Sequence, residues 1–296
     1  MRPPRRPPQR CPGRVHLSID LHTHTTASDG TTSPAELGAL AAAAGLDVVA
    51  VTDHDTTAGW AAASAGLPEG VALVRGAEIS CVAEGTSLHL LAYLFDPAEP
   101  AFAAARAALR ESRRTRAGRM VASLAAAGTG VTWEQVQALA GGTVGRPHVA
   151  QALVEAGCVP VLADAFTPEW IGTGGRHWAG KLELDVVEAI GLVRAAGGVA
   201  VFAHPGASAR GRTVHDAAVA AMARAGLAGL EVDHPDHEPA ARAHLRGLAD
   251  ELGLLRTGSS DFHGAHKTVA LGAFTTTREA YEALVARATG VPVLGA

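Results

Sequence analysis

Short apolar runs of strand length alternate with alanine-rich segments of helix length along most of the chain. Such alternation is typical of βαβ units, in which helices connect the strands of a parallel sheet. The segment 34–44 shows the helical half of the pattern, because Ser33 suits an N-cap, Pro34 suits the first turn and Gly45 suits a C-terminal stop. The pattern predicts an α/β fold. Seven strands are predicted, near residues 15–21, 47–52, 71–80, 88–95, 198–203, 229–233 and 254–259.

The alternation breaks between residues 101 and 182, where three helical segments are followed by the glycine-rich loop "GTGGRHWAGK". We interpret this region as a small helical insertion in a barrel domain formed by residues 15–100 and 183–296. Residues 1–14, "MRPPRRPPQRCPGR", are basic and rich in proline. We predict that they form a disordered tail outside the fold.

Composition narrows the class of protein. The 296 residues are 48% hydrophobic and 18% charged, which is typical of a folded chain with a large core. The formal net charge of −4 argues against a general nucleic-acid coat protein. Three scattered cysteines indicate neither a disulfide framework nor a paired-cysteine metal site, so we predict a cytoplasmic protein. No apolar run of about 20 residues predicts a membrane span.

Histidines and carboxylates collect where the predicted strands end. His22 and His24 are two residues apart and therefore point to the same face of an extended segment. The carboxyl ends of strands are where α/β barrels build their sites. His89 is the exception, because it lies near the start of its predicted strand. The other residues of this kind are Asp29, Asp53, His54, Glu78, His204, Asp261 and His263.

The residue types indicate a metal site. Imidazole and carboxylate together suit zinc, manganese or iron, whereas a calcium site would use oxygen ligands alone. A single catalytic zinc needs about three protein ligands, so this set has room for two or three ions. The His-x-His pair alone is more often ordinary packing or surface, and for the "TDHD" stretch alone the two readings are even. Their coincidence favours metal binding, because buried groups of this kind are costly unless they are satisfied.

Seven motifs resemble, in the same order, those of the polymerase and histidinol phosphatase (PHP) family. The resemblance runs from Val15 to about Ala273 and implies a distorted barrel of seven parallel strands around a trinuclear metal site. The motifs are "DLHTHTTASDG", "VTDHDT", "GAEIS", "LHLLAYLFD", "FAHP", "GLEV" and "GSSDFHG".

The resemblance implies three sets of metal ligands. The first set is His22, His24, Glu78 and Asp261; Glu78 bridges to a second ion that His89 and His204 complete; and Asp29, His54 and His263 hold the third. In the third set some members of the family have histidine where this chain has Asp29. The harder carboxylate ligand favours manganese or iron over zinc.

Within the family, the chain resembles the nucleoside 3',5'-bisphosphate phosphatases, some of which also act as 5'-3' exonucleases on short RNA. The stretches "ASDGTTSPAEL", "TDHDTTAG", "GRPHVAQALVEAG" and "HPDH" support this. It implies hydrolysis to a nucleoside 5'-monophosphate and phosphate, with Glu78 and Asp261 at the catalytic centre. Two alternatives stay open: another phosphatase of the family, acting for instance on histidinol phosphate, or a metal-binding accessory module without turnover.

Substrate contacts are expected outside the metal ligands. Arginine binds phosphate through two parallel hydrogen bonds. For most arginines of the segment 101–128 the alternative is a place on a solvent-exposed helix face. His237 is a candidate general acid, or a loop histidine that caps a helix. Trp170 and Trp178 are candidates for stacking on a nucleobase. The predicted partner is a small nucleotide or short RNA, with no obligate protein partner. The predicted substrate-binding residues are Arg116, Arg119, Arg146, His148 and His234.

Overall fold

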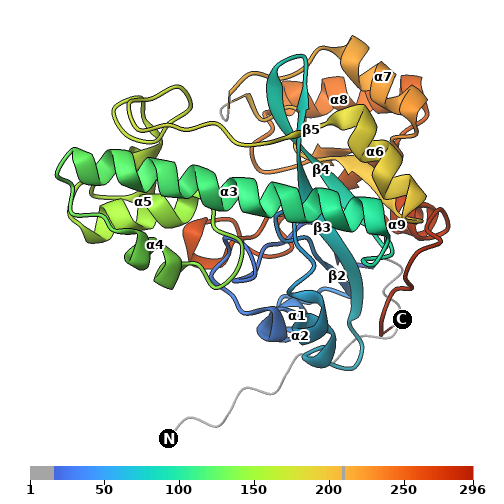
Figure 1. Cartoon of the computed structure of the whole chain (residues 1–296). Coiled ribbons are helices and arrows are strands. Elements are labelled where there is room, and N and C mark those ends of the chain that lie inside the picture. The colour runs from blue at the N-terminus through green and yellow to red at the C-terminus, as the bar shows by residue number, and fades with distance from the viewer. Residues whose placement is uncertain (1–16, 209–210, 296) are drawn as a thin grey trace, which may run out of the picture.

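The computed structural model describes residues 17–208 and 211–295, so the predicted tail 1–14 lies outside the described residues. Its centre is a curved, nearly closed sheet (Figure 1). All seven predicted strands are present, and the barrel-like α/β fold is confirmed. The sheet order is β1 (Ile19–Asp20), β2 (Val48–Val51), β3 (Ala72–Ala83), β4 (Thr86–Tyr93), β6 (Val199–Phe202), β7 (Gly229–Asp233) and β8 (Leu255–Gly258), with a short β5 (Leu184–Asp185) paired to β3.

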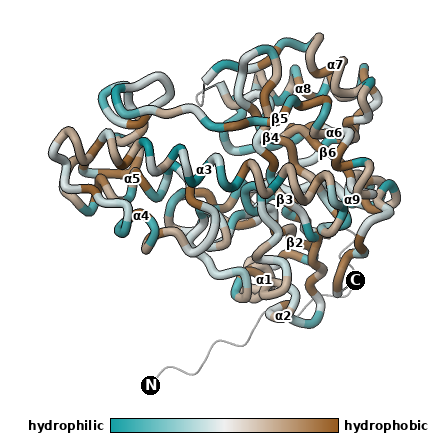
Figure 2. Tube along the Cα trace, viewed as in Figure 1, coloured by the Kyte–Doolittle hydropathy of each residue, from teal (hydrophilic) through white to brown (hydrophobic). Residues whose placement is uncertain are grey.

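Both faces of the sheet are buried, as expected for strands that are continuous apolar runs. In β2, Val49 and Val51 pack under the outer helices, whereas Val48 and Ala50 face the interior. The brown strands of Figure 2 show this apolar centre. The covering helices are α1 (Pro34–Ala43), α2 (Trp60–Ala65), α6 (Val186–Ala195), α7 (Asp216–Ala225) and α8 (Pro239–Leu252), and α9 (Arg278–Val285) packs against the interior cluster.

The expectation of seven parallel strands is wrong at β4, which runs antiparallel to both β3 and β6. A two-residue turn makes this possible. Glu84 and Gly85 have φ of 51° and 70°, the positive values of a type I′ hairpin turn. Because β4 is reversed, its beginning lies at the barrel end where β3 and β6 finish. His89, which sits opposite Ser80 of β3, therefore belongs to the same end as the other candidate ligands.

The three helices predicted between residues 101 and 182 are present as α3 (Pro100–Ala126), α4 (Trp133–Leu139) and α5 (Arg146–Glu155), followed by a 3-10 turn at Leu162–Phe166. They share a hydrophobic cluster of their own, which includes Met120 and Leu153. The first half of α3 packs differently, because Phe102 and Leu109 belong to the barrel core. Helix α3 thus spans the barrel and the insertion (Figure 1). The division into two units stays a prediction.

The insertion also touches the loop that carries the first histidines. The Thr143 N–H donates to the Ala27 carbonyl at 2.8 Å. A Cβ at Gly142 would lie 2.2 Å from the same carbonyl oxygen, so only glycine fits there.

Along the described part of the chain, no helix has the length and apolar character needed to cross a membrane.

We predict that Gly142→Ala lowers the free energy of unfolding by about 1–3 kcal/mol, because the added methyl group overpacks this contact. Gly191→Ala is the matched control. Gly191 lies within α6 with open space around its Cβ position, and alanine there should stabilise the helix slightly. Denaturant unfolding of the two variants is the measurement, and equal stabilities would contradict the close contact.

Candidate metal centre

All nine predicted ligands meet at one end of the barrel. His22 and His24 follow β1, and the turn after them carries Asp29. The remaining ligands lie at or just beyond the strand ends on this side. Two of them, His204 and Asp261, have φ of 34° and 51°, a backbone strain that is concentrated at functional sites. The other four are His54 after β2, Glu78 in β3, His89 in β4 and His263 after β8.

Glu78 lies at the centre of the cluster. Its carboxylate is buried, and both of its oxygens contact imidazole nitrogens. This places Glu78 where a carboxylate could bridge two ions. Oε1 lies 2.8 Å from His89 Nδ1 and 2.9 Å from His204 Nε2, and Oε2 lies 3.3 Å from His22 Nε2, 3.0 Å from His24 Nε2 and 3.1 Å from His54 Nδ1.

Three overlapping groups have ligand atoms within 4.8 Å of one another. The resemblance implies separate sets, with His24 in the first and His54 in the third. In the structure, His24 also joins Asp29, and His54 also joins Glu78, so the sets share members. The groups are His24, Asp29, His54 and His263; His22, His24 and Glu78; and His54, Glu78 and His89.

The donor set fits divalent cations. Asp29 Oδ1, His54 Nδ1 and His89 Nδ1 are buried and make no hydrogen bond, although the two imidazole nitrogens lie close to the Glu78 carboxylate. The Nε2 atoms of His22 and His24 face each other at 3.1 Å. Buried polar atoms left in this way cost free energy, and coordination of a metal removes that cost. Nitrogen and carboxylate donors together suit manganese, iron or zinc.

The pKa shifts of the clustered carboxylates and histidines agree with a role in metal binding. Burial would raise the pKa of Glu78, but the surrounding histidines, led by His89, hold it well below its usual value. Burial lowers the pKa of His54 well below its ordinary range and lowers the pKa of His263 to about 3. These side chains are therefore in their ligating forms. Burial would also lower the pKa of His24, but Asp261 and Glu78 raise it to about 9, so metal binding there has to release a proton.

Glu231 is a member of the site that sequence reasoning missed. It is fully buried in β7, where Oε1 lies 3.1 Å from His22 Nδ1 and Oε2 accepts from the His204 N–H at 2.7 Å. A carboxylate behind a ligating imidazole fixes its orientation and tautomer. The signal was the carboxylate inside the apolar strand "GLEV". Lys267 was also missed, and its Nζ lies 2.5 Å from Asp261 Oδ2.

Asp53 shapes the loop between the first ligands. It is buried and lies next to His54 in the sequence, but its carboxylate accepts from the Thr25 N–H at 2.8 Å and from the Ser28 hydroxyl at 2.6 Å. The loop from His24 to Asp29 is therefore held by hydrogen bonds to a carboxylate outside the ligand groups.

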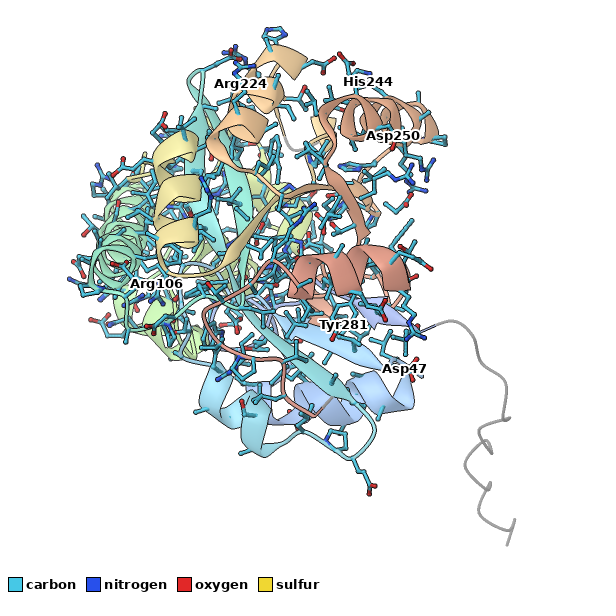
Figure 3. All side chains as sticks on the ribbon, turned by 90° about the vertical axis from the view of Figure 1, so that its right-hand side faces the viewer. Asp47, Arg106, Arg224, His244, Asp250 and Tyr281 are labelled. Carbon is cyan, nitrogen blue, oxygen red and sulfur yellow. The ribbon has the colours of Figure 1, made fainter. Side chains whose placement is uncertain are left out.

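Asp55 joins the insertion to the barrel. Its buried carboxylate accepts from the Ser80 N–H at 2.7 Å and from Arg113 Nε at 2.5 Å, and Arg110 Nη1 donates to its carbonyl at 2.9 Å. A third arginine of α3, Arg106, donates to Thr57 at 3.2 Å; Figure 3 labels Arg106. These arginines hold the segment that follows His54, so the solvated-face alternative does not describe them.

A cavity of about 790 Å³ adjoins the cluster. Arg116 lines it and is only 6% exposed, yet its Nε has no hydrogen-bond partner. Burial, followed by repulsion from Arg113 and Arg146, lowers the pKa of Arg116 to about 9. Crowded cations of this kind are stabilised by a bound anion. Five of the predicted metal ligands line the cavity: Asp29, His54, His89, His204 and His263. The cations in its lining are Arg113, Arg116, Arg146, Lys181, Arg212 and Lys267.

Of the predicted substrate-binding residues, Arg116 and Arg146 line the cavity, whereas three others make structural contacts outside its lining. Arg119 Nη2 donates to the Gly180 carbonyl at 2.5 Å. His148 Nδ1 accepts from the Gly145 N–H at 2.9 Å and caps α5. His234 Nε2 lies 3.3 Å from Asp261 Oδ2, so it supports a ligand.

His237, the predicted general acid, also lies outside the cavity lining. Its Nδ1 contacts the Val232 carbonyl at 2.8 Å, and its Nε2 accepts from the Gly206 N–H at 3.0 Å. Both ring nitrogens are therefore committed to the backbone, and neither is free to carry a proton to a leaving group. These contacts favour a positioning role for His237.

Known proteins resemble this chain over most of its length. A family model described as the PHP domain matches residues 20–112. A 3',5'-nucleoside bisphosphate phosphatase from Chromobacterium violaceum is 36% identical over 253 residues, which cover 83% of this chain and 87% of that protein. A 5'-3' exoribonuclease from Haemophilus influenzae is 36% identical over 82% of this chain and 89% of its own length.

The chain belongs to the PHP family. A crystal structure of a candidate metal-dependent phosphoesterase from Bifidobacterium adolescentis matches this PHP fold with a TM-score of 0.87 and 37% identity, over 92% of this chain and 97% of that one. The protein is thus a PHP metal-dependent phosphoesterase, and its buried histidines and carboxylates are consistent with a multi-metal PHP site.

We predict that Glu231→Gln weakens metal binding by about 10–100-fold, because glutamine keeps the shape but loses the negative charge behind His22. Competition against a metal chelator is the measurement. Glu251→Gln, at an exposed position of α8, is the matched control and should bind metal like the unaltered protein. Unchanged affinity in Glu231→Gln would show that this carboxylate does not support the PHP metal centre.

Proposed function

We propose that the protein removes the 3'-phosphate from nucleoside 3',5'-bisphosphates and yields a nucleoside 5'-monophosphate and inorganic phosphate. One observation carries the proposal: a single cavity joins the ligand cluster to the cations Arg116, Arg146 and Lys181. A small molecule with two phosphates can place one at each end. The similarity to a nucleoside bisphosphate phosphatase supports this choice of substrate.

We propose that the nine clustered residues hold two or three divalent metal ions. Manganese, iron and zinc all suit these ligands, and we predict manganese. When bound, such ions lower the pKa of water and neutralise the charge of the phosphate under attack. Glu78 bridges the cluster, and Asp261 is oriented by His234 and Lys267. We propose that turnover depends on Glu78 and Asp261, because Glu78 lies between the ligand groups and Asp261 is held by two neighbouring side chains.

The phosphate that is not cleaved is bound by the cations of the insertion. Arg146 Nη1 contacts Thr173 Oγ1 at 3.3 Å, which leaves most of its donors for a ligand. Arg116 has its buried guanidinium in the same wall. A histidinol phosphatase needs no second phosphate site, so these cations favour the bisphosphate. A module without turnover has no use for a substrate cavity beside a complete ligand set.

A second activity, 5'-3' exonuclease action on short RNA, is favoured by the similarity to an exoribonuclease and by Arg212, an exposed cation of the cavity lining. The first nucleotide of a 5'-phosphorylated RNA presents the same pair of groups, with its 3'-phosphate joined to the next nucleotide. The same site could serve both substrates. The cytoplasm as compartment and the lack of an obligate protein partner stay predictions.

The test is to reconstitute the protein with Mn²⁺ and assay adenosine 3',5'-bisphosphate, histidinol phosphate and a short 5'-phosphorylated RNA in parallel. We expect adenosine 5'-monophosphate and phosphate from the first, nucleotides released from the 5' end of the RNA, and no turnover of histidinol phosphate. Hydrolysis of histidinol phosphate alone would overturn the proposal in favour of that phosphatase. No hydrolysis of any of the three by metal-loaded protein would refute it.

We predict that Arg116→Met raises KM for adenosine 3',5'-bisphosphate about 10–100-fold, because a charge-assisted contact to phosphate contributes roughly 1.5–3 kcal/mol. KM for adenosine 3'-monophosphate, which lacks the second phosphate, should change less than about twofold by the same reasoning. Arg114→Met, which removes an exposed arginine of the same helix, is the control. Equal loss on both substrates would place Arg116 outside the second phosphate site.

We predict a loss of activity at alkaline pH that depends on Lys181. Burial and then Arg113 lower the pKa of Lys181 to about 8, against the opposing effect of Glu183 and Asp55. The ammonium is therefore charged below about pH 8 and neutral above it, so kcat/KM for the bisphosphate should fall as pH rises through this value. In Lys181→Arg the guanidinium keeps its charge, so the fall should move upward from about pH 8 toward about pH 9, where Arg116 loses its charge. An identical pH profile in both proteins contradicts this role.

A further inference from the structure

We propose that Trp178 is a binding platform for the nucleobase of the substrate, a role that rests on the function proposed above. Trp178 is 41% exposed. Among the described residues, the other large apolar side chains left exposed are Leu40, Val161, Leu182 and Val187, and none of these lines the cavity. Among the described residues, Trp178 is therefore the exposed large apolar side chain that lines the cavity beside the metal centre.

The segment around Trp178 is fixed from one side by helix α3. Ser123 Oγ lies 2.8 Å from His177 Nδ1, immediately before the tryptophan. Arg119 donates to the Gly180 carbonyl, two residues after the tryptophan, and Ser112 Oγ accepts from the Leu182 N–H at 2.6 Å, four residues after it. The segment that carries the indole is therefore held on both sides by contacts to a single helix. An apolar ring that is fixed and left uncovered is suited to receive a ligand.

The structure also separates the two candidate tryptophans. Trp170 packs against the hydrophobic cluster of the insertion, and its ring stacks on His177 at 6.2 Å between centroids. It does not line the cavity. Trp170 therefore supports the loop from behind, and Trp178 is the tryptophan that can meet a substrate.

The surroundings of Trp178 select the chemical class of the ligand. Lys181 lies three residues further along the cavity wall, and Arg146 packs at 5.5 Å over the ring of Phe166 in the same wall. Gly180 leaves room beside the indole, since a Cβ there would lie 3.5 Å from the ring. A flat aromatic surface next to cations fits a planar base attached to a phosphorylated sugar. A sugar or cyclitol bisphosphate would contact the cations but has no planar base to stack on the indole.

The platform is expected to bind every base in a similar way. Stacking is tolerant of sequence because each base presents a π face. Among the described residues that line the cavity, none is asparagine or glutamine, the side chains that most often read base edges through two hydrogen bonds. Glu183 is held by Lys181 and by Ser87. We therefore expect the site to recognise a nucleoside with little preference between bases.

The experiment compares Trp178→Ala with Trp178→Phe in the Mn²⁺-loaded protein. The substrates are adenosine 3',5'-bisphosphate and the corresponding base-free ribose derivative with the same two phosphates. For Trp178→Ala we expect KM of the adenosine compound to rise about 5- to 150-fold, with kcat within about twofold and no change on the base-free compound. Trp178→Phe should restore most of the loss. Leu182→Ala, an exposed residue of the same segment outside the cavity, is the control.

A second measurement separates this proposal from the proposed function. Calorimetric titration with adenosine 5'-monophosphate reports binding without turnover, and we expect Trp178→Ala to weaken it by the same factor. If the unaltered protein binds this nucleotide through Trp178 but hydrolyses no bisphosphate, the platform stands and the proposed function fails. If bisphosphate is hydrolysed with the same KM in Trp178→Ala, or if the base-free compound is equally affected, the platform is refuted and the proposed function stands.

Discussion

The barrel end has to keep carboxylates and imidazoles within hydrogen-bonding distance of one another and away from water, and the rest of the structure depends on this constraint. Glu78 contacts five histidines while buried. Such groups are costly unless each has a defined partner. The fold supplies those partners from different directions, with Glu231 behind His22 and Asp53 across the first loop. A metal centre of this kind is held by its supporting residues as much as by its ligands.

The insertion takes part in that support. Arg113 of α3 binds the Asp55 carboxylate beside His54, and Gly142 lies against the loop that carries Asp29. The same region provides Arg116, Arg146 and Trp178 to the cavity. One segment therefore both stabilises the ligand-bearing loops and forms the surface that would select the substrate. Changes in specificity at this surface are constrained, because several neighbouring residues also hold the metal centre in place.

The sequence predicted much of this arrangement. Strand positions and the helices of the insertion followed from apolar periodicity, and the nine candidate ligands followed from motifs near strand ends together with the resemblance to the PHP family. The direction of β4 did not, because a two-residue turn at Glu84 and Gly85 is a local signal that the wider alternation outweighed. Glu231 and the contacts of His237 were missed because a side chain's partner depends on strands distant in the sequence. Spacing along the chain indicates which residues are unusual, but only packing shows what each one touches.

The Arg113–Asp55 pair has a consequence for how substrate reaches the site. Both side chains are almost fully buried, with 5% and 0% of their surfaces exposed. Swinging α3 away from the barrel would separate them and leave a charge without its partner in a dry environment, at a cost of several kcal/mol. Large hinge opening of the insertion is therefore disfavoured, and the insertion forms a fixed wall of the cavity. A substrate would therefore reach the cavity beside the ligands without a large movement of the insertion.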